Sequence, residues 1–178
     1  MARGGDSRAE TPMRVLGVDP GTAVTGWGVI ERRAGRVAHL AHGAVAASSR
    51  ATLAAKLATV YAALTDLCAS WSPDVVVLER NFVGRNVQSA FRLGEVRGVA
   101  MLVAASAGIG VAEYPPATVK LAVTGNGRAE KDQVQRAIAQ ELGVGEPLAP
   151  DAADALAIAL CHMHSSRFAA ALAKVGAR

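Results

Sequence analysis

The first apolar run of the chain ends in a single carboxylate, and no other stretch constrains the fold as strongly. Residues 15–18 (Val-Leu-Gly-Val) are apolar and rich in β-branched side chains, which predicts a buried β-strand. Asp19 closes this run, Pro20-Gly21 predicts a tight turn, and a second strand is predicted over 24–30. A buried carboxylate costs free energy unless it is paired, protonated or bound to a metal. Asp19 is therefore either the residue that starts the turn by bonding the backbone after it or one part of a site.

Glycine is frequent around this carboxylate. Gly21, Gly26 and Gly28 lack a Cβ, so another group can approach the backbone closely at these positions. The segment is predicted to form two strands around a turn, with room for a close neighbour.

The rest of the chain predicts an α/β fold with a mixed five-stranded sheet and helices on both of its faces. Residues 75–78 (Val-Val-Val-Leu) form an uninterrupted apolar run, typical of a strand buried on both sides, and this run ends in Glu79. From 52 to 71, leucine and valine recur at helical spacing until Ser72-Pro73-Asp74 breaks the pattern. Further strands are predicted over 36–45 and 109–114, and further helices over 87–105, 116–123, 130–142 and 151–164.

Length and composition predict one cytoplasmic domain. The chain has 178 residues, enough for a single well-filled core, which we expect over 13–167. The first segment, 1–12, is polar, lacks the apolar middle of a signal peptide and is expected to be disordered. The alanine-rich end, 168–178, is expected to fray. The longest apolar stretch considered as a membrane span, 99–111, is interrupted by serine and glycine and is too short.

Charge and cysteine content exclude some classes of protein and leave the partner open. Basic residues outnumber acidic ones by 19 to 15, so the net charge of +4 permits an anionic partner without demonstrating one. Cys68 and Cys161 stand far apart and have no CxxC spacing. We expect two small core residues rather than a disulfide or a zinc site.

Four acidic residues occupy positions at which a site can form. Asp19 and Glu79 each end an apolar strand, and Asp151 and Asp154 lie three residues apart at the start of an otherwise apolar helix. Acids at a helix start are usually capping residues, and this reading stays open for Asp151 and Asp154. If all four converge, their mutual repulsion favours a divalent cation, and oxygen ligands favour Mg²⁺ or Mn²⁺ over zinc. Two such ions about 4 Å apart can activate a water and stabilise the leaving oxygen in phosphodiester cleavage.

These features, together with several further motifs, resemble the RuvC family of Holliday junction resolvases within the RNase H-like nucleases. The resemblance extends from about residue 14 to residue 164. Its motifs are Gly17-Val18-Asp19-Pro20-Gly21 with Thr25-Gly26-Trp27-Gly28, Leu78-Glu79 with Phe82 and Asn86, Leu93-Gly94 with Arg97-Gly98-Val99-Ala100, Val119-Lys120, Ala129-Glu130-Lys131 with Val134-Gln135, and Asp151-Ala152-Ala153-Asp154-Ala155-Leu156-Ala157.

The resemblance implies a metal-dependent, structure-selective DNA endonuclease with the RNase H-like fold. It implies that Asp19, Glu79, Asp151 and Asp154 are the catalytic, metal-binding acids, although some relatives have His at the position of Asp151. It implies two Mg²⁺ ions per active site, for which Mn²⁺ substitutes. It also implies a homodimer that resolves four-way junctions by paired symmetric nicks at a thymine-containing sequence, in recombination and repair, together with the RuvA–RuvB branch-migration complex.

Basic and aromatic residues near the acids are candidates for DNA binding. Lys120 and Lys131 match basic residues that the family uses near the cleaved DNA, and lysine can bind phosphate or stabilise the charge that develops in phosphoryl transfer. Phe82, in a predicted loop, could stack on an unpaired base or fold back on the core. Arg85 and Asn86 are candidates for backbone contacts.

Other residues are expected to be structural. Arg97 is a weaker candidate for a DNA contact and equally well a surface residue, and the Gly94–Ala100 stretch could pack in the core or against a second subunit. His162 lies eight residues after Asp154, about 12 Å along a helix, which is too far for it to bind the same metal ions as the four acids.

Three alternatives remain beside the resolvase reading. Asp19-Pro20-Gly21-Thr22 resembles the first phosphate loop of sugar kinases and actin-like ATPases, but those proteins need two related domains and this chain is too short for both. A catalytically weak or inactive junction-binding protein of the same fold is a second alternative. A YqgF-type nuclease is a third, although the Asp151–Asp154 block and the Lys131 segment favour RuvC.

Overall fold

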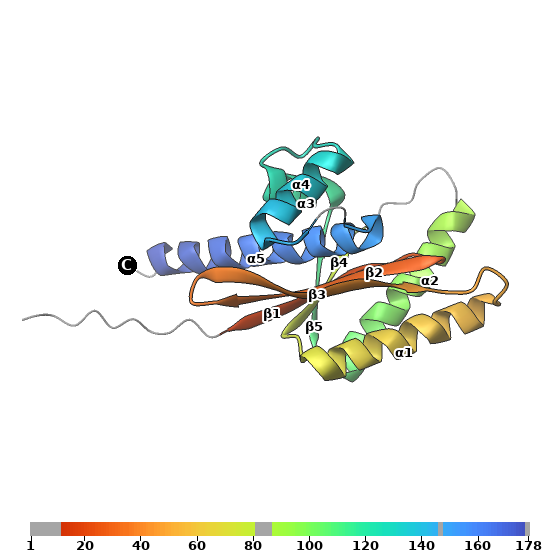
Figure 1. The fold of residues 1–178 in the computed structure, drawn as a ribbon. Coiled ribbons are helices and arrows are strands. Elements are labelled where there is room, and N and C mark those ends of the chain that lie inside the picture. Colours follow the sequence, from red (N-terminus) through yellow and green to blue (C-terminus); the bar gives the residue numbers. More distant parts are fainter. Residues whose placement is uncertain (1–11, 81–86, 146–147, 177–178) are drawn as a thin grey trace, which may run out of the picture.

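A five-stranded mixed sheet with strand order β3-β2-β1-β4-β5 forms the centre of the molecule (Figure 1). The computed structural model describes residues 12–80, 87–145 and 148–176. The strands are β1 (Met13–Asp19), β2 (Val24–Arg33), β3 (Arg36–Ala46), β4 (Val75–Glu79) and β5 (Gly110–Tyr114). The helices are α1 (Leu53–Trp71), α2 (Val87–Ser106), α3 (Pro116–Thr124), α4 (Lys131–Leu142) and α5 (Pro150–Gly176). The predicted mixed sheet and its five strands are confirmed.

Strand direction explains why two acids meet at one edge of the sheet. β1 pairs with β4 in parallel, with Val18 opposite Leu78, and β4 pairs with β5 in parallel. Asp19 follows Val18 and Glu79 follows Leu78, so both carboxylates lie at the carboxyl ends of adjacent parallel strands. β2 and β3 run antiparallel and extend the sheet on the other side of β1. Ala34 and Gly35 have φ of 51° and 76°, which forms the tight turn between β2 and β3.

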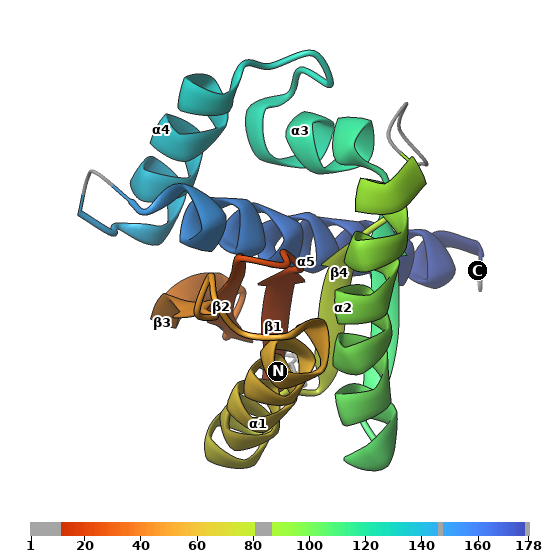
Figure 2. The ribbon, with the colours of Figure 1, turned by 90° about the vertical axis from the view of Figure 1, so that its right-hand side faces the viewer.

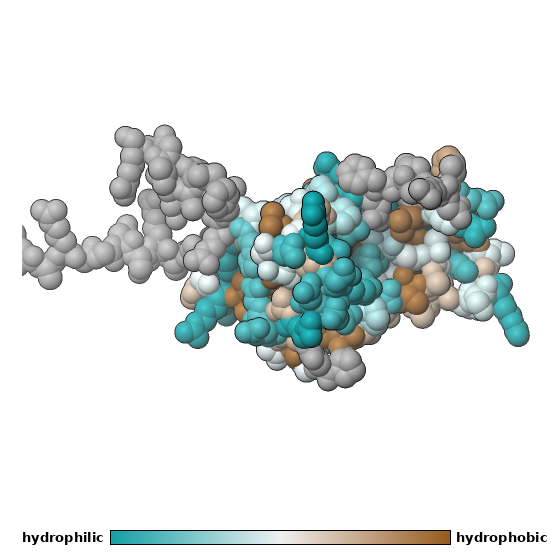
Figure 3. All heavy atoms as spheres, turned by 90° about the horizontal axis from the view of Figure 1, so that it is seen from above, coloured by the Kyte–Doolittle hydropathy of each residue, from teal (hydrophilic) through white to brown (hydrophobic). Residues whose placement is uncertain are grey.

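Helices cover both faces of the sheet (Figure 2). α1 and α2 lie against one face, whereas α5 crosses the other face and carries α3 and α4 on its outer side. Hydrophilic side chains gather over the centre of that outer side (Figure 3). The sheet thus separates two hydrophobic layers that share no helix.

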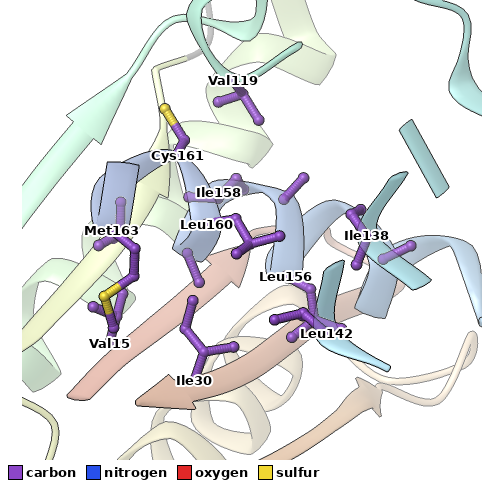
Figure 4. Packing of buried hydrophobic residues seen from close by; sticks show 14 of the residues in the cluster. Val15, Ile30, Val119, Ile138, Leu142, Leu156, Ile158, Leu160, Cys161 and Met163 are labelled. Atoms are coloured by element: carbon purple, nitrogen blue, oxygen red, sulfur yellow. The ribbon is translucent and has the colours of Figure 1, made fainter. Parts of the chain in front are cut away.

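Each layer is filled by a different set of apolar side chains. Strand residues alternate between the faces, so Val15 and Ile30 pack with α5 while Leu16 and Val29 pack with α1 and α2. The α5 layer contains Leu156, and the close-up in Figure 4 shows this side chain and its neighbours above β1 and β2. Both cysteines are buried and free, Cys161 in the α5 layer and Cys68 in the other, as predicted.

α1 illustrates how local sequence fixes an element. The Thr52 hydroxyl caps its start by accepting from the Ala55 N–H at 3.3 Å, and Val60, Leu64 and Cys68 form its buried stripe. Ser72, in the left-handed region at φ 44°, ends it. Among the described residues, α1 is also the one helix that is long and apolar enough to span a membrane by length and composition. The stretch considered from the sequence, 99–111, lies in a different part of the chain.

α5 reaches the sheet closely because the strands beneath it carry glycine. A Cβ at Gly17 would overlap the carbonyl oxygen of Ala155, and a Cβ at Gly26 would overlap that of Asp151. The close neighbour predicted near the first two strands is therefore the backbone of α5. Its first turn is held directly over the end of β1.

The structure extends the last predicted helix, and three predicted DNA contacts lie outside the described residues. The last helix continues to Gly176 instead of ending near His164, because residues 168–174 are mostly alanine and leucine, which favour a helix. Phe82, Arg85 and Asn86 lie outside the described residues, so their predicted contacts stay predictions.

Substituting Gly17 by alanine tests the close approach of α5. Gly17→Ala is expected to lower the free energy of unfolding by about 2 kcal/mol or more, because its Cβ meets backbone that cannot turn aside. Chemical denaturation measures this loss. Gly110→Ala is the matched control, since a Cβ there meets nothing within 4 Å. Equal stability of the two variants would contradict the packing.

Candidate active site

Four carboxylates from three parts of the chain are brought to one end of the sheet. Asp19 ends β1, Glu79 ends the adjacent β4, and Asp151 and Asp154 lie in the first turns of α5. All four side chains are half-buried. The convergence that the sequence analysis had to assume is thus present, because the close contact of α5 with the glycines of β1 and β2 sets the helix start above Asp19.

The other three carboxylates lie close enough to Asp19 to shift its pKa. Burial, followed by the negative charges of Asp154, Glu79 and Asp151, raises the pKa of Asp19 to about 7. Burial and the charge of Asp154 also raise the pKa of Glu79. An aspartate that is half protonated near neutral pH is unusual for a structural turn residue. Its environment favours a cation or a proton over an uncompensated charge.

Two lysines supply positive charge at this cluster. Lys131 Nζ lies 2.7 Å from Asp154 Oδ2, and this hydrogen bond raises the pKa of the lysine above its usual range. The position of Lys131 is fixed by a capping box, in which the Glu130 and Gln133 side chains bond the backbone at the start of α4. Lys120, from α3, lies near enough to Glu79 to lower its pKa in part.

A pocket connects the lysines with the acids. Its volume is about 270 Å³, and polar side chains reach it from four elements. Its charged lining residues are Glu79, Lys120, Lys131 and Asp154. The Val119, Val134 and Ala157 side chains form an apolar wall behind them. The pocket therefore joins an acidic side, suited to cations, to a basic side, suited to the oxygens of a phosphate.

The donor set fits a hard divalent cation. The four acids offer oxygen atoms alone, as Mg²⁺ and Mn²⁺ prefer, and burial together with neighbouring negative charge raises the pKa of Asp19. Within the ranges that the structure describes, however, no three acidic, histidine or cysteine side chains already surround one point as metal ligands would. Asp154 instead bonds Lys131. Metal binding would require the acidic side chains to reorient.

Residues near the site that sequence analysis treated as structural have clear partners. His162 Nδ1 lies 3.0 Å from the Tyr114 hydroxyl, and His164 Nε2 lies 2.7 Å from Glu141 Oε1. Arg97 forms an ion pair with Glu113 on β5, and its side chain is three-quarters buried, so this contact holds α2 against β5. These contacts attach α5 and α2 to their neighbours and take no part in the acidic cluster.

Sequence analysis assigned no role to two basic residues, Lys56 and Arg92. Both line a second polar pocket on the α1 and α2 side of the sheet. They are 36 residues apart in the sequence and belong to no motif, so only the folded structure shows that they lie close together. Among the described residues of this pocket, no acidic side chain accompanies them.

Comparison with known proteins gives a consistent result. Residues 15–162 match the family model described as crossover junction endodeoxyribonuclease RuvC. A protein of that name from Sorangium cellulosum is 46% identical over 165 residues, covering 93% of this chain and 92% of the relative. The structure titled T. thermophilus RuvC in complex with Holliday junction substrate aligns with a TM-score of 0.83 and 31% identity, covering 88% of this chain and 96% of that one.

In the absence of divalent ions, removing the charge of Asp19 is expected to raise the free energy of unfolding. The folded state holds the Asp19 proton up to about pH 7, whereas the unfolded chain releases it near pH 3.8, so wild-type stability falls between these pH values. The full shift corresponds to at most about 4 kcal/mol, and we expect Asp19→Asn to gain about 1–2 kcal/mol at pH 8 because solvent screens part of it. Denaturation in EDTA at pH 4 to 8 measures the gain.

The control for this measurement is Asp132→Asn, which removes an exposed carboxylate on α4. The difference in stability between Asp19→Asn and wild type should grow from pH 4 to pH 7 and stay constant above that. A difference that does not change with pH would contradict the raised pKa.

Proposed function

This chain belongs to the RuvC family of crossover junction endodeoxyribonucleases, and we propose the site and chemistry by which it acts as a Holliday-junction-resolving endonuclease. The observation that carries the proposal is the convergence of Asp19, Glu79, Asp151 and Asp154 at the end of a parallel strand pair, beside a pocket with two lysines. We propose these four acids as the catalytic and metal-binding residues.

The proposed cofactor is Mg²⁺, two ions per site, with Mn²⁺ as a substitute. When bound, two divalent ions would lower the pKa of an attacking water and stabilise the leaving oxygen of the phosphodiester. The support from this chain is its all-oxygen donor set, and the burial and neighbouring negative charges that raise the pKa of Asp19.

The chain's own residues divide the remaining work. Asp19 lies at the centre of the cluster, since its pKa responds to each of the other three acids. Lys131 and Lys120 hold positive charge at the edge of the same pocket, where they can bind phosphate oxygens and stabilise charge that develops on them. The apolar wall behind them limits the water around the reacting phosphate. Phe82, Arg85 and Asn86 remain proposed DNA contacts.

We propose that the protein acts as a homodimer, so that two sites nick opposing strands of one junction. α2 presents an apolar and small-residue face: Phe91 is 71% exposed, Leu102 is 57% exposed, and Cβ atoms at Gly94 and Gly98 would meet nothing within 4 Å. The spacing 91, 94, 98, 102 places all four on one side of the helix. A second copy of α2 would bury them and bring the two backbones close together.

Further partners follow from family membership. We propose that the protein works with the RuvA–RuvB branch-migration complex in the cytoplasm, where its DNA substrate lies. The inactive-binder alternative is not favoured, because the full set of four acids is retained.

Cleavage of a synthetic four-way junction tests the proposed site. Wild type should nick two opposing strands in Mg²⁺ or Mn²⁺ and leave a linear duplex of the same sequence uncut. Asp19→Asn should lose at least about a thousandfold in rate, as expected when charge stabilisation of phosphoryl transfer fails, yet still bind the junction. Asp132→Asn is the matched control and should cleave normally. Full cleavage by Asp19→Asn, or cleavage in EDTA, would refute the metal site.

The proposed dimer has its own test. Phe91→Glu places a charge on the exposed face of α2 and should convert a dimer to a monomer in analytical ultracentrifugation, with paired nicks replaced by single ones. Leu121→Glu is the control, because Leu121 is 55% exposed and belongs to α3 rather than to α2. A wild type that is monomeric at micromolar concentration, or a Phe91→Glu variant that stays dimeric, would contradict this interface.

A further inference from the structure

We propose that Thr22, Lys56 and Arg92 form a second phosphate-binding pocket, which holds a backbone phosphate of the junction close to the phosphate that is cut. The inference rests on the proposed function, since it names a second contact for the same DNA. It concerns the opposite side of the sheet from Lys120 and Lys131.

The pocket is formed by three separate parts of the chain. Thr22 comes from the β1–β2 turn, Ala51, Leu53 and Lys56 come from the start of α1 and the residues before it, and Arg92 comes from α2. Its volume is about 210 Å³, below the roughly 300–1,000 Å³ of typical small-molecule sites. The size suits a phosphate group better than a whole nucleotide.

The charges of this pocket are uncompensated. Lys56 is half-buried and Arg92 is exposed, and neither forms an ion pair within the described part of the chain. Among the residues that the structure describes, the lining contains no carboxylate, and the first turn of α1 contains no acidic residue. Lys131, by contrast, is paired with Asp154. Two cations that converge without an anion of the protein provide a site for an anion from outside.

The walls of the pocket are held in place before any ligand binds. The Thr25 hydroxyl donates to the Gly21 carbonyl at 3.0 Å, which fixes the turn that carries Thr22. The Ala47 N–H donates to the Ala23 carbonyl at 3.0 Å, which ties the segment before α1 to the same turn. With Thr52 capping α1, Lys56 starts from a fixed backbone, so binding a phosphate costs little ordering of the main chain.

Chain geometry limits how far this pocket lies from the acids. Thr22 follows Asp19 by three residues, so their Cα atoms are at most about 11 Å apart. One strand of DNA advances about 3.4 Å per nucleotide along the helix axis, and its phosphates are farther apart than this rise because the strand winds around the axis, so the span covers at most about three nucleotides. Figure 2 shows the end of β1 between the α1–α2 side and the α3–α5 side. A strand that crosses this end can place one phosphate at the acids and a neighbouring one at Lys56 and Arg92.

The first arm of the test removes charge from the pocket. Lys56→Gln and Arg92→Gln should each weaken junction binding by about tenfold at low salt, as for loss of one charge-assisted contact. Each should also reduce the slope of log affinity against log salt by about 0.9. Arg33→Gln is the control, since this exposed arginine lies at the far end of β2, and it should change neither quantity. Thermal unfolding confirms that each variant is folded.

The second arm identifies the phosphate itself. Junctions carrying a single neutral methylphosphonate at successive positions within about three nucleotides of the cut are bound to wild type and to Lys56→Gln. One position should cost wild type about tenfold in affinity and cost Lys56→Gln nothing, because the variant has already lost that contact. The same cost in both proteins at every position would overturn the inference.

The outcomes separate this inference from the proposed function. If wild type neither binds nor cuts the junction, the proposed function fails and the second pocket fails with it. If wild type cuts normally while both variants keep its affinity and salt slope, the proposed function stands and the second pocket alone is wrong. The inference would also be overturned if Lys56→Gln and Arg92→Gln bound inorganic phosphate more weakly than wild type but bound the junction as tightly as wild type.

Discussion

The close approach of α5 to the glycines of β1 and β2 determines the rest of the site. Four carboxylates repel one another, and no local sequence preference would gather them. The contact places the first turn of α5 over Asp19 because Gly17 and Gly26 have no side chain to keep the helix away. The free energy of the apolar layer beneath α5 holds the acids together against their repulsion. Burial, together with the negative charge of the other three acids, raises the pKa of Asp19 to about 7, so the repulsion is only partly relieved.

Most elements of the fold could be predicted from the sequence, because their signals are local. The apolar run at 75–78, the helical spacing in 52–71 and the turn at Pro20-Gly21 each depend on neighbouring residues. The four acids could be predicted by position, but their convergence could not, since it depends on packing between β1 and α5. The end of α5 was placed too early, and the ion pair of Arg97 could not be predicted because its partner Glu113 lies on a different element. Lys56 and Arg92 were missed for the same reason.

The two sides of the β1 end differ in how they balance charge. On the α5 side, Lys131 and the acids neutralise one another in part, so positive charge there is already engaged. On the α1 side, Lys56 and Arg92 have no such partner among the described residues. The first side suits chemistry, in which charge must be balanced closely around a reacting group. The second suits attachment, in which unpaired positive charge attracts a polyanion over a distance.

The sheet separates the two hydrophobic layers, so substitutions in one layer can occur independently of substitutions in the other. Side chains of the α5 layer and those of the α1–α2 layer meet on opposite faces and belong to different clusters. Substitutions in residues that share no contact tend to act additively. Substitutions in α1 and α2 can therefore be tolerated without repacking α5, the helix that carries Asp151 and Asp154. On this plan one face of the sheet is free to change while the other keeps its packing.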